Sequence, residues 1–265
     1  MKKCLIAAIG IFLLSRPAFA DSSQEYMDSR LKKSMTVTGH LFPNARKHPQ
    51  RVITRVDECN KSDVWFQSGF DRQDVLHTRL EKGKKRCEVV IHEMLRRDHP
   101  FSFSFDFMVE DTNRSASDQW FMIAQVHSKP GKGESWRCPV LSFESHQGKF
   151  RMYNRWDTNK YSITYPGRTC AQPGTSIGSR TMFEGYDYEP DTWYNIEISG
   201  KFSFIDEHAC LTVYINGEMV GFECGYNTFN DFFHMFVKLG IYKPTTWRTL
   251  DQIKIRYNNI KFHQE

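Results

Sequence analysis

Two side chains that can exchange protons interrupt an otherwise apolar segment, FVKLGIYK, near the end of the chain. Side chains of a β-strand alternate between its two faces, so Lys238 and Tyr242 share one face with Gly240. The valine, leucine and isoleucine between them share the other face, which is typical of a strand packed on an apolar core. The sequence therefore predicts that an amine and a phenol stand together on the polar side of a sheet.

The same alternation places ionisable groups on one face of two other segments. In KRCEVVIHE, Arg86 and Glu88 share a face, and in IAQVHS, Gln125 and His127 do. Imidazole and phenol groups can act as general base and general acid, while guanidinium and amide groups can bind a carboxylate. We expect the three strands to bring these groups together on the concave face of a curved sheet.

Each feature also has a purely structural interpretation. Arg86 and Glu88 would form an ion pair along a strand, and His127 would be a hydrogen-bonded surface histidine. Lys238 and Tyr242 would be an edge lysine and a tyrosine that keeps its hydroxyl in water. The presence of all of them in one chain favours a functional site.

The elements that must position these groups are β-strands, whose signals recur roughly every ten residues with turn residues between them. This pattern predicts an all-β protein, a two-sheet β-jelly roll (a concanavalin-like sandwich) with a concave groove, in a single domain over residues 51–265. The best helical candidate is RQDVLHTRLEKG, residues 72–83. Strands are expected at residues 101–109, 120–127, 138–145, 149–156, 192–200, 209–223, 235–242 and 251–263.

The first twenty residues have the layout of a secretory signal peptide, with a basic start, a short apolar run and an A-x-A pattern that predicts cleavage after Ala20. The run is too short to span a membrane. Removal of Lys2, Lys3 and Arg16 lowers the formal charge from +5 to +2, because 33 basic residues (36 − 3) then face 31 acidic ones. So small a charge argues against nucleic acid as a partner. We expect residues 21–50 to form an N-terminal arm and the mature protein to be periplasmic or secreted.

Six cysteines remain after cleavage, an even number that predicts three disulfides in an exported chain. Cys210 and Cys224 flank a hairpin that turns at Asn216-Gly217, so they lie nearly opposite each other and form the favoured pair. The other two pairs are assigned by neighbourhood in the sequence alone. The expected disulfides are Cys59–Cys87, Cys138–Cys170 and Cys210–Cys224.

The order R-x-E, Q-V-H and K-x-G-I-Y resembles that of the jelly-roll polysaccharide lyases. Alginate lyases of this type carry R-(S/T)-E-L-R, Q-(I/V)-H and Y-F-K-A-G-x-Y segments in the same order. Cys87, Val89 and Val237 depart from that pattern. The segments WFMIAQVHS, DTWYNIEISGKFS and LTVYINGEMV are more similar to the heparin-lyase-I-like branch, which includes glucuronan lyases. The resemblance covers roughly residues 86–245.

This resemblance implies β-elimination on an anionic polysaccharide that contains uronic acid. A base removes the proton on C5, an acid protonates the leaving O4, and donors stabilise the charge that builds on the carboxylate. Gln125 and Arg86 suit the last task, and Tyr242 suits the acid. The base is either His127 or Tyr242, the latter with its pKa lowered by the cation of Lys238. One tyrosine can serve both roles in glucuronate and mannuronate, where H5 and O4 lie on the same side; iduronate and guluronate favour His127 as base.

Further contacts are expected along the polymer. Arg151 and Arg155 share a strand face in KFRMYNRW and, with Arg86 and Glu88, are the candidate substrate-binding residues. The alternative is that they are solvated strand charges. Because side chains cover all three chemical tasks, we expect no organic cofactor and no metal ligands in the site. A calcium ion would be structural, although no ligand spacing specifies one.

Two other classes of function fit the sequence. A glycoside hydrolase needs two carboxylates at a fixed separation, and the candidates are Glu184, Asp187 and Glu189 in the loop-like FEGYDYEPD. A non-catalytic, lectin-like carbohydrate-binding protein would keep the fold without needing the acid–base groups. An unsaturated, ultraviolet-absorbing product distinguishes a lyase from both.

Overall fold

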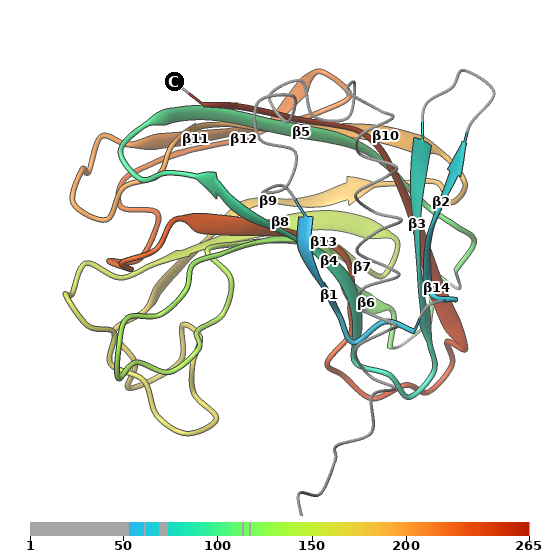
Figure 1. Ribbon diagram of the computed structural model, residues 1–265, viewed down its shortest axis with the longest axis horizontal. Helices are drawn as coiled ribbons and strands as arrows, with labels where there is room; N and C mark the ends of the chain where they lie inside the picture. Colours follow the sequence, from blue (N-terminus) through green and yellow to red (C-terminus); the bar gives the residue numbers. More distant parts are fainter. Residues whose placement is uncertain (1–52, 61, 69–73, 113, 117, 265) are drawn as a thin grey trace, which may run out of the picture.

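Two seven-stranded antiparallel sheets pack face to face in the computed structural model (Figure 1). The described residues contain no helix, and so none that could cross a membrane. The expected signal peptide and N-terminal arm lie outside the described residues. The structure describes residues 53–60, 62–68, 74–112, 114–116 and 118–264.

The first sheet contains the three segments that carry the predicted site. Its strand order is β1-β4-β13-β6-β7-β8-β9, so β4, β13 and β6 are immediate neighbours although β13 is far from both in the sequence. The strands of this sheet are β1 (Ile53–Asp57), β4 (Arg86–Leu95), β6 (Trp120–His127), β7 (Leu141–His146), β8 (Lys149–Trp156), β9 (Gly178–Asp187) and β13 (Met235–Tyr242).

The second sheet has the order β12-β11-β10-β5-β14-β3-β2 and bends around the first. The first sheet lies on the inner side of this bend, so its outer face is concave (Figure 1). The strands of the second sheet are β2 (Val64–Ser68), β3 (Asp74–Glu81), β5 (Pro100–Val109), β10 (Trp193–Lys201), β11 (Cys210–Ile215), β12 (Glu218–Cys224) and β14 (Gln252–Gln264).

Alternating phenylalanines of β5 form the centre of the core between the sheets. Phe103, Phe105 and Phe107 are at most 2% exposed, as the alternation of FSFSFDFMV predicts. Phe107 meets Phe143 of the first sheet edge to face, with ring centroids 5.2 Å apart. Burial of each such side chain stabilises the fold by roughly 1.5–3 kcal/mol, so this ladder is a large part of what joins the two sheets.

The tight turns and the disulfides agree with the sequence-based expectations. Asn216 and Gly217 have φ angles of 51° and 81°, and Gln147 and Gly148 have 50° and 75°. Two successive positive φ angles are characteristic of a type I′ hairpin turn. All three expected disulfides are confirmed: Cys59–Cys87, Cys138–Cys170 and Cys210–Cys224.

The prediction of a helix at residues 72–83 is wrong, because β3 occupies this segment and pairs with both β2 and β14. Leu76 and Leu80 are four residues apart, which resembles a helical face. The buried residues also include Thr78, which completes a period of two. Tertiary pairing on both sides therefore overrides a spacing that fits either element.

The interpretation of FEGYDYEPD as a loop is also wrong in its first half, because β9 continues to Asp187. The register of β9 with β8 shifts twice, and Gly185 has a φ angle of +89°. Bulges of this kind interrupt the alternation that identifies a strand in sequence. The hydrolase candidates therefore lie on and just after an edge strand.

Candidate active site

The hydrogen-bond register brings the predicted side chains onto the concave face of the first sheet. Lys238 lies opposite Gln125, and His127 lies opposite the residue two positions before Lys238. On the other side of β13, Tyr242 lies opposite Arg86. Residues paired across antiparallel strands point to the same side. The three segments therefore share one polar face, while the aliphatic residues between them pack in the core.

Gly240 forms a β-bulge at the centre of this face. The register between β13 and β6 slips between Leu239 and Tyr242, so the ladder is interrupted there. The φ angle of Gly240 is +142°, and a Cβ at this position would lie 2.3 Å from the carbonyl oxygen of Cys87. No side chain fits at this point, and the bulge sets where Tyr242 stands relative to β6.

Tyr257 of β14 reaches the bulge from the second sheet. Its hydroxyl oxygen lies 2.7 Å from the carbonyl oxygen of Ile123 on β6 and 3.0 Å from that of Gly240 on β13. Burial raises its pKa well above the ordinary value, so the hydroxyl stays a donor at every physiological pH. One buried phenol thus bridges the two strands where their own ladder is broken.

A buried carboxylate, that of Glu88, organises the groups around it. It accepts a hydrogen bond from the amide of Gln125, and its Oε2 lies 3.5 Å from Nζ of Lys238 and 3.6 Å from a guanidinium nitrogen of Arg86. Nζ of Lys238 also lies 2.8 Å from Asp57. Burial raises the pKa of Glu88, and the two cations oppose that shift. Glu88 is only 2% exposed, so the structure makes it a support for the site rather than an open contact for a polymer.

The phenol of Tyr242 is partly exposed, and a cation lies against its ring. The guanidinium carbon of Arg86 is 4.6 Å from the ring centroid. Burial raises the pKa of Tyr242, with Arg86 opposing the shift and Glu88 adding to it. For the alternative in which Tyr242 is the base, the sequence analysis expects Lys238 to lower this pKa. The structure instead pairs Lys238 with carboxylates, and burial raises the pKa of the phenol above its ordinary value, so that the phenol holds its proton at neutral pH.

His127 ends β6 and lies in an aromatic environment. Its ring stacks on Phe236 with centroids 5.7 Å apart, and Trp136 approaches it edge-on at 6.2 Å. Burial lowers the pKa of His127 to about 3, and the positive charges of Lys238 and Arg86 act in the same direction. The imidazole is therefore neutral at neutral pH and carries a free electron pair.

His127 and Tyr242 stand at opposite ends of this row of polar groups. The residue paired with Tyr242 on β6 is Met122, which is separated from His127 by roughly 16 Å of extended strand. Gln125 and Lys238 lie between them.

A second buried carboxylate, Glu144 of β7, supports the neighbouring part of the face. It accepts hydrogen bonds from the indole of Trp120 at 2.7 Å, the hydroxyl of Ser142 at 2.9 Å and the guanidinium of Arg151 at 3.0 Å. The sequence analysis missed Glu144. The alternation of the expected strand at residues 138–145 places Ser142 and Glu144 on the polar face, so the same parity argument identifies it.

Arg151 and Arg155 flank one aromatic ring, as two residues that share a strand face should. Their guanidinium carbons lie 5.2 Å and 5.7 Å from the ring centroid of Tyr153, which stands between them on β8. Arg155 also donates to the hydroxyl of Ser142 at 3.1 Å. This makes a cationic and aromatic area beside the row of polar groups.

The carboxylates proposed for a hydrolase are far from this row. All three are more than half exposed and paired with a cation: Glu184 with Arg151, Asp187 with Lys149 at 3.1 Å, and Glu189 with Arg114 at 2.9 Å. Three strands, β6, β7 and β8, separate β9 from β13. No pair of them has the desolvated setting that keeps one carboxyl group protonated as an acid.

The fold resembles solved polysaccharide lyases. The endo-β-1,4-glucuronan lyase of the fungus Trichoderma reesei gives a TM-score of 0.61 at 16% identity, over 79% of this chain and 90% of that one. The alginate lyase AlyC3, solved in complex with dimannuronate, gives a TM-score of 0.51 at 13% identity, over 72% of this chain and 74% of that one. At such low identity the likeness shows the fold alone, and it confirms the predicted jelly roll.

A family model described as polysaccharide lyase matches residues 45–261. The chain therefore belongs to the polysaccharide lyase family and is an enzyme of that class, which confirms the family predicted from its motifs. No curated protein sequence matches it.

Proposed function

We propose that this enzyme cleaves a uronic-acid-containing, anionic polysaccharide by β-elimination on the concave face of the first sheet. The observation that carries the proposal is the protonation state of two side chains on that face. His127 is neutral, and Tyr242 is protonated, with Lys238 and Gln125 between them. A neutral imidazole can accept a proton and a phenol can donate one, which are the two transfers that β-elimination needs.

In this proposal, the groups between the two rings stabilise the negative charge that develops on the substrate carboxylate. Gln125 uses one amide N–H on Glu88, and an amide has a second. Lys238 supplies a positive charge beside it. Glu88 and Asp57 hold these donors in position before a substrate arrives, and such preorganisation stabilises a transition state more than mobile donors do.

The proton transfers are assigned to two different side chains. His127 takes the proton from C5, the electrons of that bond form the C4=C5 double bond, and the C4–O4 bond breaks as Tyr242 gives its proton to O4. A bound carboxylate would raise the pKa of His127, which the nearby cations now lower, towards the range of an effective base. Base and acid on opposite sides of the ring suit iduronate or guluronate. In glucuronate or mannuronate, where H5 and O4 lie on the same side, Tyr242 would have to lose its own proton before it could serve both roles, and His127 would then be dispensable.

The anionic character of the substrate is supported by the cations along the face. Arg151 and Arg155, on either side of Tyr153, would meet successive carboxylates of the polymer. In this scheme the side chains supply base, acid and charge stabilisation, and we include no organic cofactor. Three disulfides fit a protein that works outside the cytosol, in the periplasm or beyond it.

The test is a panel of glucuronan, alginate and heparin, incubated with the wild type, Tyr242→Phe and His127→Gln. We expect at least one polymer to give a product with ultraviolet absorbance from the C4=C5 bond, and Tyr242→Phe to abolish it. Tyr214→Phe, on β11 of the second sheet, is the matched control and should stay active. New reducing ends without absorbance would establish a hydrolase, and binding without cleavage would establish a lectin-like protein.

A further inference from the structure

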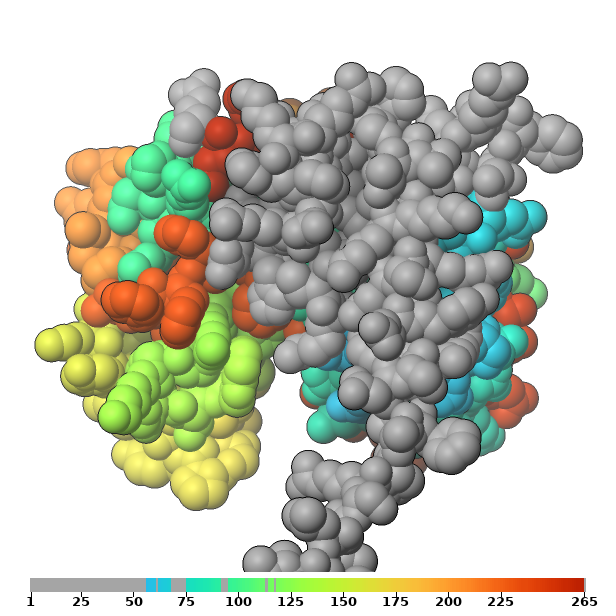
Figure 2. Space-filling model, in the orientation of Figure 1, coloured from blue at the N-terminus to red at the C-terminus, as the bar shows by residue number. Residues whose placement is uncertain are grey.

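Three segments without regular strands meet beside His127 and are called the loop cluster here: residues 128–140, 157–177 and 225–234. Figure 2 shows the first and the last of them in contact on the viewed face, in yellow-green and orange. The first segment follows directly on β6, so the cluster borders the end of the row of acid–base groups. Its surface is therefore part of what a bound polymer would meet next.

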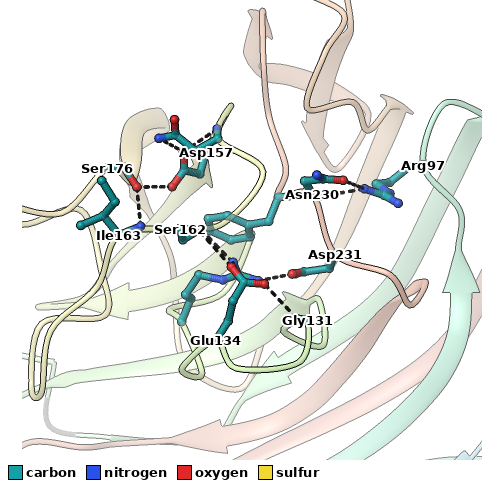
Figure 3. Close-up of polar contacts among 12 residues, drawn as sticks. Arg97, Gly131, Glu134, Asp157, Ser162, Ile163, Ser176, Asn230 and Asp231 are labelled. Atoms are coloured by element: carbon teal, nitrogen blue, oxygen red, sulfur yellow. Dashed lines mark hydrogen bonds and ion pairs between the residues drawn. The ribbon is translucent and has the colours of Figure 1, made fainter.

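Arg137 fixes the cluster internally. Its guanidinium donates to Glu134 and to the hydroxyl of Ser162, both at 2.8 Å, and forms an ion pair with Asp231. It also lies 4.4 Å from the ring centroid of Phe229. Glu134 additionally accepts from the backbone N–H groups of Gly131 and Ser162, and Figure 3 shows Glu134, Ser162 and Asp231 close together. One 4%-exposed cation thus joins all three segments.

Trp136 directly precedes Arg137 but, unlike it, is exposed to solvent. It is 56% exposed, although its neighbour Arg137 is buried and Cys138, one residue further, is bonded to Cys170. Its ring centroid lies 6.2 Å from that of His127 and 6.4 Å from that of Phe236, with the ring planes steeply inclined to both. The backbone that carries Trp136 is therefore held in place on one side, while the indole itself stays open to solvent next to the acid–base groups.

We propose that Trp136 forms a binding subsite for one pyranose ring of the polymer, adjacent to the ring that is held between His127 and Tyr242. This inference rests on the proposed function. The C–H face of a pyranose is apolar and its rim is polar, so it can cover an indole and leave its hydroxyl groups in water. Because the backbone is fixed before binding, little conformational freedom is lost when the sugar stacks.

The experiment measures binding in the Tyr242→Phe background, where oligosaccharides of glucuronan, alginate and heparin can be titrated without turnover. We expect Trp136→Ala to weaken binding of a hexasaccharide about tenfold, and Trp136→Phe to retain most of it. Trp193→Ala is the matched control, since Trp193 is 42% exposed on the second sheet and should leave binding unchanged. Because Trp136 is exposed, its replacement should leave the unfolding temperature unchanged.

The outcome separates this inference from the proposed function. If a polymer gives the unsaturated product but Trp136→Ala binds hexasaccharides as the parent does, the subsite is refuted and the lyase chemistry stands. If no polymer gives that product, the proposed function fails. Binding that still depends on Trp136 would then support a sugar subsite in its own right, and binding that is independent of Trp136 would overturn it.

Discussion

The centre of the first sheet and the loop cluster both present side chains to the same face, but they hold them in different ways. At the centre, Lys238 and Gln125 are placed by the backbone ladders of β4, β13 and β6. In the loop cluster, Trp136 is placed by the side-chain contacts of Arg137 and by the Cys138–Cys170 disulfide. We call the first region ladder-held and the second loop-held. Groups of the ladder-held region are sensitive to changes in backbone shape, whereas those of the loop-held region depend on a few side-chain contacts.

The largest effect is expected from Gly240→Ala, which attacks the backbone of the ladder-held region. The new Cβ would lie 2.3 Å from the carbonyl oxygen of Cys87, so β13 or β4 must move, and product formation should fall at least about 100-fold. The ultraviolet assay measures this. Gly217→Ala is the control: its φ angle is also positive, at +81°, but nothing lies within 4 Å of the new Cβ, so activity should persist. Equal losses in both variants would contradict the role of the bulge.

The next effect is expected from Arg137→Gln, which attacks the loop-held region. The buried carboxylates of Glu134 and Asp231 would lose their cation, at a cost of about 3–5 kcal/mol in the free energy of unfolding. Denaturant unfolding measures this, with Arg114→Gln, whose partner Glu189 is exposed, as a near-neutral control. Where the variant is folded, kcat on the shortest cleaved oligosaccharide should be kept. A fall in kcat as large as that in Gly240→Ala would break the comparison.

A smaller effect is expected from Tyr257→Phe, which removes the bridge behind the bulge. The carbonyl groups of Ile123 and Gly240 would lose a buried donor, at a cost of about 1–3 kcal/mol. Tyr188→Phe is the matched control, because its buried hydroxyl bonds elsewhere, to Ser145 and Gln119. Both variants should lose similar stability, but only Tyr257→Phe should lower kcat, about tenfold, with KM unchanged. Equal kcat values would make Tyr257 merely structural.

The smallest effect is the pH dependence contributed by His127, which lies where the two regions meet. Its pKa is about 3 in the folded protein and 6.5 as the ordinary value, so the unfolded chain binds more protons between these pH values. The stabilisation is complete above pH 6.5 and is lost as the pH falls towards 3. Urea unfolding at pH 7.5, 6 and 5 should show a shallower decline for His127→Gln than for the wild type. Parallel declines in the two proteins would contradict this contribution of His127. His263→Gln, at an exposed histidine, is the control and should decline as the wild type does.

The sequence predicts the ladder-held region better than the loop-held one, for a physical reason. A strand has a period of two, so parity alone places Lys238 with Tyr242 and Gln125 with His127 before any coordinates exist. The same alternation also places Glu144 on the polar face. It fails at residues 72–83 and at β9, where a spacing fits two elements or bulges hide the alternation.

The contacts that fix the loop cluster have no such period. Arg137 meets Ser162 and Asp231, which are 25 and 94 residues away in the sequence. Likewise, the residues next to Tyr257 in the sequence do not indicate that its hydroxyl hydrogen-bonds at the bulge of the other sheet. Such pairs depend on the complete fold, which is why the support of the site is less predictable than the groups that it supports.

The Cys59–Cys87 disulfide couples the chemistry of the site to its surroundings. Cys87 lies between Arg86 and Glu88 on β4, and Cys59 follows two residues after Asp57, the counter-ion of Lys238. Formation of this disulfide therefore fixes the end of β1, where Asp57 neutralises Lys238. A chain kept under reducing conditions has no such anchor, so we expect the site to form fully only where the disulfide can be oxidised.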